Sequence, residues 1–425
     1  MGQKNSADVA TRELRGPWPW LATVVAVILT LAVIAGLIYS RRAANQVTEK
    51  AVGSAVVSGV GFSCRLPVLA GASGGFIRFP DGTVTLDAKV TLNPGKGQYM
   101  YSYDAAVQRW VPVPGSAISP DRRSYAYIAQ TTGIPGQMTA LSLHTREIAT
   151  AKDRILWEGS GTPMGPDLLS WLSSGIYFSA VLLPAVDPEG LAFPAVYMVD
   201  PNHPGGPRRV GPNPAPQPPS PGQAEYAMPE MFTLVGGDSA WATGNRVPTE
   251  SPSPNKPPAP GTFGPDSVVR MDLRDGRVDT WFTVSGDELV SLMGLDNQGR
   301  PILLLFQPKA PIDGGSALNE PPLTRVLLLT GPNRTVELSS GNDAFHPAAT
   351  PLSDTHGIWF GSWNSVWLYT QSDGLRQVAT VQAGLFPSPS PPPGFPAKSV
   401  PAPGANPGMP AYMQGTVVAP AGSCT

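Results

Sequence analysis

The stretch Ser267 to Phe282, SVVRMDLRDGRVDTWF, decides the fold of this chain. Its first half is rich in residues that favour strands, and Asp275-Gly276 is a dipeptide typical of tight turns. From Val278 onward the chain returns with strand formers again. The stretch therefore predicts a β-hairpin.

The same pattern recurs loosely along the chain, at intervals of about 41 to 73 residues between turns. Short strands that recur at such intervals predict an all-β repeat architecture, a β-propeller. Five more outer hairpins are predicted: Tyr99 to Val113 with a turn near Asp104, Thr139 to Trp157 near Thr145, Val196 to Val210 near Asn202, Arg325 to Leu338 near Pro332-Asn333, and Ser365 to Val381 near Asp373-Gly374.

Further strand pairs precede these hairpins, as the inner strands of blades would: Ala117 to Ile128, Gly175 to Leu183, Met231 to Thr243, Leu289 to Phe306 and Gly357 to Trp363. Gly75 to Leu86 is another predicted hairpin, with Asp81-Gly82 at its turn. Six outer hairpins predict a six-bladed β-propeller, and a seventh blade within the longest interval is the alternative. The last strand-like piece is Tyr412 to Ala419.

Composition limits the classes of partner. The chain has 425 residues and a net charge of −2, so no overall field favours nucleic acid. Its 50 prolines cluster between the strand-like runs, which predicts long loops on a folded scaffold. The main proline-rich insertions are Pro212 to Gln223, Val247 to Pro265, Pro308 to Pro322 and Phe386 to Met409.

One apolar span lies near the start of the chain. Leu21 to Tyr39 has no charged residue and is long enough to cross a bilayer as a helix. A buried core helix and a cleaved signal peptide are the alternatives. Three basic residues on each side leave the orientation undecided by charge. We expect a cytoplasmic tail at 1–17, a transmembrane helix at 18–40, a linker at 41–61 and an extracytoplasmic propeller at 62–425.

The two cysteines, Cys64 and Cys424, bracket the whole β region. The first and last blades of a closed propeller meet, so a disulfide between these residues would join the ends of the ring. Two unrelated free thiols are the alternative. Because disulfides persist outside the cytoplasm, the predicted bond favours an extracytoplasmic domain, with the N-terminus inside.

The segment Ile118-Ser119-Pro120-Asp121, followed by Tyr125-Ala126-Tyr127, resembles the blade motif of TolB-type propellers. Arg122 stands where that family usually has glycine. Leu352-Ser353-Asp354 before Ile358 is a second, weaker match to the motif. The resemblance implies the fold and carries over no functional residue, because the motif is structural. The chain as a whole also resembles membrane-anchored propellers of bacteria.

No catalytic, cofactor or metal site is predicted. Gly71 to Gly75 matches G-x-S-x-G, but a strand pattern follows the serine where a nucleophile elbow needs a helix. The four histidines, His144, His203, His346 and His356, are scattered without zinc-ligand spacing. We expect His144 to be exposed beside a turn. The sequence shows no paired nucleophile and base.

Two functions fit these observations. The first is a membrane-anchored binding, scaffold or sensing module for a protein, peptide or glycan ligand, because function tends to lie on the loops of a rigid scaffold. The second is an extracytoplasmic hydrolase or lyase acting on envelope polysaccharide, which needs carboxylates to converge near the axis. Candidates for an axial face are Asp167, Asp238, Asp287 and Asp354, with Trp171 as an aromatic at the pore mouth. We expect Trp241, Trp359, Trp363 and Trp367 to pack between blades.

Overall fold

The structure is a computed structural model that describes residues 49–91, 101–131, 139–161, 167–180, 182, 195–203, 205–211, 228–229, 231–245, 265–284, 288–307, 324–340, 345–382, 384–386 and 416–425. The chain divides into two units, Met1–Val47 and Thr48–Thr425, and every described residue belongs to the second. The predicted membrane span Leu21 to Tyr39 therefore lies outside the described residues. Within the described ranges, no helix is long and apolar enough to cross a membrane.

The described residues are all-β, apart from one 3₁₀ turn, η2 (Gly115–Ala117), and every strand pairing is antiparallel. The largest sheet has nine strands. In spatial order they are β23 (Leu352–Asp354), β24 (Gly357–Trp363), β25 (Ser365–Thr370), β26 (Gly374–Val381), β1 (Glu49–Val57), β4 (Thr83–Thr91), β3 (Ser73–Phe79), β2 (Cys64–Ala70) and β27 (Val417–Pro420).

Five smaller sheets follow the chain order. They are β5 (Ser102–Asp104) with β6 (Arg109–Val111); β7 (Ser124–Thr131), β8 (Thr139–Glu147) and β9 (Asp153–Gly161); β10 (Asp167–Leu172), β11 (Gly175–Ala180), β12 (Ala195–Val199) and β13 (Arg208–Arg209); β14 (Met228–Pro229), β15 (Leu234–Gly236), β16 (Ser239–Asn245), β17 (Pro265–Asp272) and β18 (Val278–Thr283); and β19 (Leu289–Leu295), β20 (Pro301–Phe306), β21 (Thr324–Gly331) and β22 (Arg334–Ser339).

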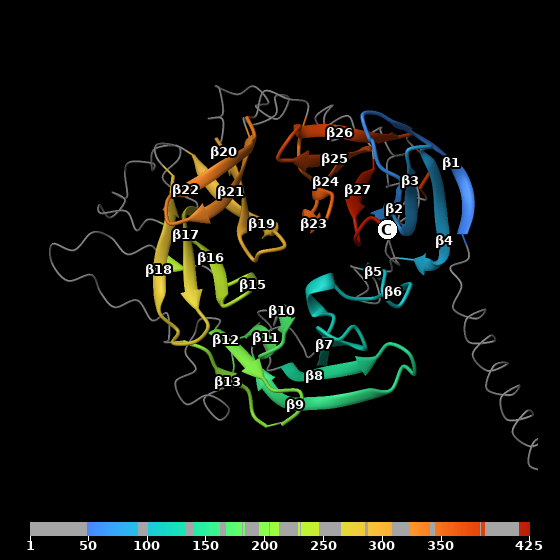
Figure 1. Ribbon diagram of the computed structural model, residues 1–425. Coiled ribbons are helices and arrows are strands. Elements are labelled where there is room, and N and C mark those ends of the chain that lie inside the picture. Colours follow the sequence, from blue (N-terminus) through green and yellow to red (C-terminus); the bar gives the residue numbers. More distant parts are fainter. Residues whose placement is uncertain are drawn as a thin grey trace, which may run out of the picture. The chain divides into compact units, whose positions relative to one another are not determined.

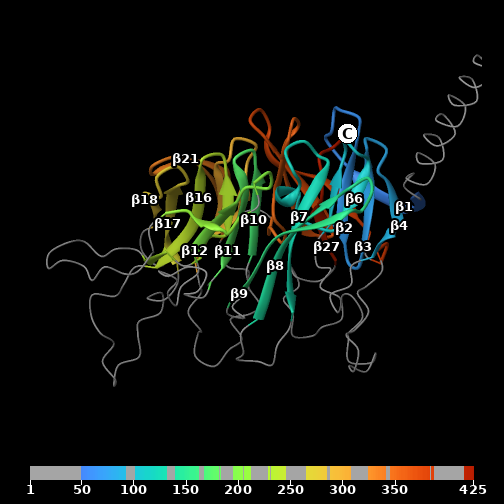
Figure 2. The same ribbon diagram turned by 90° about the horizontal axis from the view of Figure 1, so that it is seen from below.

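Successive sheets pack face to face, and the last packs against the first, which makes the arrangement propeller-like (Figure 1). Figure 2 shows the strands of successive sheets standing side by side. Each junction buries apolar side chains from both of its sheets, and this burial is the main favourable term that holds the sheets together. Examples are Phe76 with Tyr103, Val111 with Tyr125, Leu143 with Phe178, Val196 with Ala240, Trp241 with Leu303, and Leu328 with Phe360.

β1 and β27 come from the two ends of the β unit, and each pairs with one strand from the start of the unit and one from its end. The C-terminal strand β27 pairs with β2, where Leu69 faces Ala419, and with β24, where Ser362 faces Val418. The strand β1 pairs with both β4 and β26. The expectation that the two ends of the β region meet is confirmed for residues 418–420, which pair with β2.

β1 lies within residues 41–61, which the sequence predicts to be a linker, so β structure is already present before Phe62. Its sequence, EKAVGSAVV, is rich in small residues and gives only a weak strand signal. Pairing with β4 and β26, which come later in the chain, supplies the order that its own composition does not.

The predicted hairpins are present among the described residues. In the Ser267 to Phe282 stretch, Gly276 adopts a positive φ of 71°, and the carboxylate of Asp275 accepts a hydrogen bond from the backbone N–H of Arg277. One predicted turn is wrong. Thr145 lies inside β8, paired on both sides, and the turn comes later, where Ala151 has a φ of 58°.

Candidate functional site

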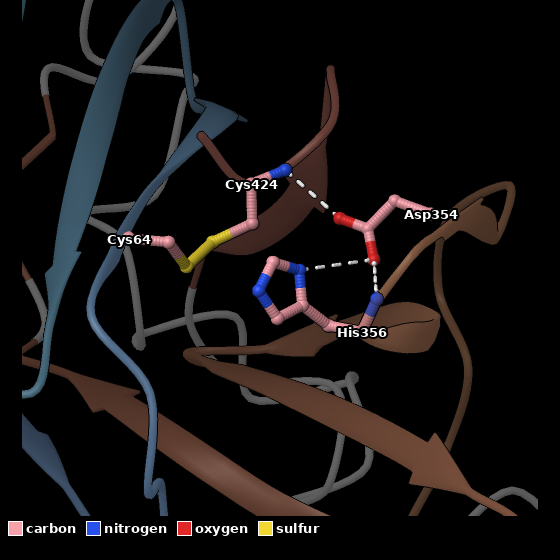
Figure 3. The surroundings of a disulfide bond; sticks show 4 residues. All are labelled: Cys64, Asp354, His356 and Cys424. Carbon is pink, nitrogen blue, oxygen red and sulfur yellow. Dashed lines mark hydrogen bonds and ion pairs between the residues drawn. A yellow bond between two sulfur atoms is a disulfide. The ribbon is translucent and has the colours of Figure 1, made fainter.

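Cys64 and Cys424 form a disulfide with their Cα atoms 5.5 Å apart, which confirms the predicted bond (Figure 3). The bond joins the start of β2 to the segment after β27. The backbone of Thr425 also pairs with Arg65: its N–H donates to the carbonyl of Arg65, and its own carbonyl accepts from the N–H of Arg65. The C-terminal residues are therefore held covalently and by hydrogen bonds.

Asp354 also holds the C-terminal residues in place. One carboxylate oxygen accepts a hydrogen bond from the backbone N–H of Cys424 at 2.9 Å, and the other accepts from the N–H of His356 at 2.8 Å. The side chain of Asp354 is only 3 % exposed, and Nδ1 of His356 lies 3.5 Å from it. The His356 ring packs on Phe62, with centroids 4.4 Å apart. The carboxylate that was a candidate for the axial face thus fixes the end of the chain.

The other axial candidates lie on separate sheets. Asp167 is the first residue of β10, where desolvation of its carboxyl raises its pKa. Asp238 lies in the turn between β15 and β16, and its carbonyl accepts from the N–H of Leu273. Asp287 lies outside the described residues. The convergence of carboxylates that a polysaccharide hydrolase or lyase needs therefore stays a prediction.

The tryptophans divide between core and surface. Trp241 and Trp367 are buried in clusters between sheets, as expected, whereas Trp359 is buried in a cluster whose strands all belong to the nine-stranded sheet. Trp171 is half-buried and packs against the cluster shared by the β7–β9 and β10–β13 sheets. Trp363 differs, because it is half-buried and lines a cavity at the end of β24.

This cavity has a volume of about 310 Å³ and lies where β24 turns into β25. No Asp, Glu, Lys or Arg is among its lining residues. Burial lowers the pKa of His346 below its ordinary value, so this imidazole is neutral at neutral pH. The cavity is therefore polar but uncharged. The lining residues are His346, Ser362, Trp363, Asn364, Ser365, Trp367, Gln377 and Thr380.

Internal hydrogen bonds orient the polar groups of the cavity. The indole N–H of Trp367 donates to Oγ of Ser365 at 3.0 Å, and the amide of Gln377 donates to Oγ1 of Thr380 at 2.6 Å. Since both hydroxyls accept a hydrogen bond, each keeps its O–H proton to donate. The carbonyl of the Gln377 side chain adds an acceptor. The arrangement can therefore bind a neutral ligand that has several hydroxyl groups.

Asn364, one of the lining residues, is held by Thr416, the residue before β27. The side-chain oxygen of Asn364 accepts from the backbone N–H of Thr416 at 2.9 Å, and the N–H of Asn364 donates to the Thr416 carbonyl at 2.8 Å. Asn364 has a φ of 53°, a left-handed conformation that asparagine tolerates better than most residues. The segment that carries Trp363 is thus positioned by the strand that the disulfide anchors.

The histidines lie on separate elements, and within the described residues no group of three or more His, Cys, Asp and Glu side chains is arranged to hold a metal ion. The expectation that His144 is exposed is wrong. It lies on β8, its side chain is only 13 % exposed, and the Tyr127 ring stacks on it at a centroid distance of 4.8 Å.

No protein family and no curated protein matches this sequence. Solved structures with similarity include an oligogalacturonate lyase in complex with manganese, at 11 % identity and a TM-score of 0.37, covering 75 % of this chain and 74 % of the other. An uncharacterised protein of Listeria monocytogenes has 8 % identity and a TM-score of 0.33 over 78 % and 84 %. Dipeptidyl peptidase 4 of Porphyromonas gingivalis has 11 % identity and a TM-score of 0.31 over 78 % and 47 %. At these low scores, the activities named are properties of those proteins alone.

Proposed function

We propose that this chain is a membrane-anchored, extracytoplasmic binding module whose cavity beside Trp363 takes a neutral carbohydrate. The observation that supports this function best is the uncharged, polar lining of the cavity with an indole at its wall. Its volume of about 310 Å³ is at the small end of the range for ligand sites, which fits one or two sugar units.

The chemistry of the lining suits a sugar for two reasons. The apolar face of a pyranose ring packs on an aromatic side chain, and Trp363 supplies one that is not fully buried. The ring hydroxyls need donors and acceptors in fixed positions, which Ser365, Gln377 and Thr380 provide. An anionic ligand would find no compensating cation among the lining residues.

Two further features support the proposed location. The Cys64–Cys424 disulfide is the kind of bond that persists outside the cytoplasm. The charge-free span Leu21 to Tyr39 would hold the module on the membrane, with the N-terminus inside. Protease added to intact spheroplasts should then digest the β unit, whereas complete protection of residues 62–425 would reverse this orientation.

The sheets would form the blades of a propeller, six in number, with seven as the alternative. The count depends on whether the β5–β6 hairpin is a blade, because within the described residues it consists of two strands of three residues each. An experimental structure that resolves residues 92–100 tests whether this hairpin is a short blade of its own.

Titration of the purified chain with neutral and acidic oligosaccharides by calorimetry tests the binding function. We expect neutral sugars to bind and Trp363→Ala to weaken binding at least about tenfold, or 1.4 kcal/mol. Trp171→Ala is the matched control, because it also removes a half-buried indole and lies on the face favoured by the sequence. Loss of binding in Trp171→Ala alone would move the site to β10, and a preference for acidic sugars would contradict the neutral cavity.

A further inference from the structure

A chain of hydrogen bonds crosses the sheet of β7, β8 and β9, away from the cavity beside Trp363. Ser142 and His144 are two residues apart on β8, so their side chains share one face of the sheet. Oγ of Ser142 lies 2.8 Å from Nε2 of His144. Nδ1 of His144 lies 2.7 Å from Oδ2 of Asp153, the first residue of β9. Tyr127 on β7 donates to Oδ1 of the same carboxylate at 2.9 Å.

For a neutral imidazole, these contacts determine which ring nitrogen carries the proton. Burial raises the pKa of Asp153, but the hydrogen bonds from His144 and Tyr127 outweigh it, and the net pKa is lowered. Asp153 is therefore ionised at neutral pH and can only accept. Burial, with the hydrogen bond to Asp153, raises the pKa of Tyr127 to about 12, so its hydroxyl remains a donor. Nδ1 of neutral His144 must then carry its proton, which leaves Nε2 to accept the hydroxyl proton of Ser142.

The imidazole is held in place and is partly accessible. The Tyr127 ring stacks on it with an interplanar angle of 17°, and the His144 side chain is 13 % exposed. The His203–Asp200 pair of the same chain differs in exposure: its histidine side chain is 87 % exposed, as expected of an ordinary surface ion pair. The Ser142 arrangement is therefore more constrained than a surface pair.

We propose that Ser142 is a nucleophile with His144 as its general base, and that this site accepts acyl groups from activated carboxylic esters. Asp153 and Tyr127 are positioning residues that hold the imidazole in the productive tautomer. This site is separate from the proposed carbohydrate cavity. Its order of nucleophile, base and carboxylate is the one that activates serine in acyl transfer.

The reaction balances with these groups alone. Oγ of Ser142 forms a bond to the ester carbonyl carbon while its proton passes to Nε2 of His144. The carbon–oxygen bond to the alcohol then breaks, and the alcohol leaves with that proton. Water attacks the acyl-serine in the second half, giving up a proton to His144, which returns it to Ser142 as the acid is released.

The pairing of β8 within the sheet limits the expected rate of acyl transfer. β8 is the middle strand, paired on both sides at Ser142, so its backbone N–H groups are used within the sheet and do not form an oxyanion hole. Each missing oxyanion donor costs about 10²- to 10³-fold in rate. We therefore expect slow acyl transfer from activated esters and no cleavage of amides.

Treatment of the purified chain with p-nitrophenyl acetate and with a fluorophosphonate, followed by peptide mass spectrometry, tests the proposal. We expect one modified serine, Ser142, and no modification in Ser142→Ala. His144→Gln should slow labelling by about 10²-fold or more, since it removes the base. Ser124→Ala, a change at a half-buried serine on the adjacent β7, is the control and should label like the wild type.

The pH profile of the wild-type labelling rate needs no variant. The rate should fall on acidification, because a doubly protonated imidazole cannot accept the proton of Ser142. Asp153→Asn should change this profile as well as the rate, which a purely structural role would not do. The titratable or charged groups around His144 are Asp153 and Glu158 on β9, Tyr125 and Tyr127 on β7, Arg146 on β8, and Tyr101 before β5.

Three results would overturn the proposal: labelling spread over other serines, equal labelling rates in a folded His144→Gln variant and the wild type, or a labelling rate that does not change with acidification. Thermal unfolding of each variant shows whether it is folded. If His144→Gln does not fold, the wild-type pH profile and the site of labelling still decide the question.

Discussion

The backbone N–H of Cys424 donates to the carboxylate of Asp354 across 2.9 Å, so the residue that forms the disulfide is also held by the last part of the β unit. Cys64 attaches the same residue to the first part. One C-terminal residue therefore joins both sides of the closure, and stability should depend on each attachment.

Replacement of Cys424 by serine should lower the free energy of unfolding by roughly 2–4 kcal/mol, because the bond closes a loop with a sequence separation of 360 residues. Urea denaturation of the two proteins measures the difference. Ser423→Ala, at an exposed neighbouring position, should be close to neutral. Equal stability of Cys424→Ser and the wild type would show that the bond does not hold the domain closed.

Asp354→Ala should destabilise the domain by about 1–3 kcal/mol, because it leaves the N–H groups of Cys424 and His356 without their acceptor. Asp354→Asn keeps one acceptor oxygen and should cost less. When Asp354→Ala is combined with Cys424→Ser, the loss of stability should be smaller than the sum of the two single losses, since both changes act on one terminal segment. Strict additivity in a double-mutant cycle would show that Asp354 and the disulfide stabilise the domain independently.

Gly361 on β24 allows the close approach of β27. A Cβ at this position would lie 2.5 Å from the carbonyl oxygen of Val418 and 3.0 Å from the Cα of Ala419. Gly361→Ala should therefore displace β27 and destabilise the domain by about 1–3 kcal/mol, as overpacking does. Gly61→Ala meets nothing within 4 Å and is the control. Equal denaturation midpoints for the two variants would contradict the observed contact.

Acid sensitivity should depend on Asp272, at the end of β17. Its side chain is 5 % exposed and accepts hydrogen bonds from Nε and Nη2 of Arg274 at 3.0 and 2.6 Å, which hold the pKa of Asp272 well below its ordinary value. A lowered folded-state pKa contributes stability above the unfolded value of about 3.9, and this contribution is lost as pH falls further. Asp272→Asn should be less stable at pH 7, with the difference from wild type shrinking below about pH 4. A constant difference at all pH values would exclude this linkage.

Features set by local sequence were predictable. Asp81-Gly82, Asp275-Gly276 and Asp373-Gly374 marked their turns, because a positive φ at glycine follows from the dipeptide itself. The Cys64–Cys424 bond was predictable because the chain has only two cysteines, placed at the two ends of the β region. β1 was missed, because its order comes from pairing with strands far along the chain.

The sites depended on register, which the sequence does not show. His144 contacts Ser142 on its own strand and Asp153 on the next strand, and the pairing of β8 with β9 that brings Asp153 there has an irregularity between Leu143 and His144. The available signal was a Ser-x-His pattern on a predicted strand, with an acidic residue at the start of the returning strand. The cavity beside Trp363 was hidden for a similar reason, since Thr416 orders Asn364 from 52 residues away.

Peptide mapping of protein purified without reductant tests the central claim, that the two ends of the β unit are joined, most directly. Digestion with thiols blocked beforehand should yield a single cross-linked pair of peptides containing Cys64 and Cys424, and this pair should separate on reduction. Two blocked, unlinked cysteines in the native protein would contradict the closure and remove the main support for an extracytoplasmic location.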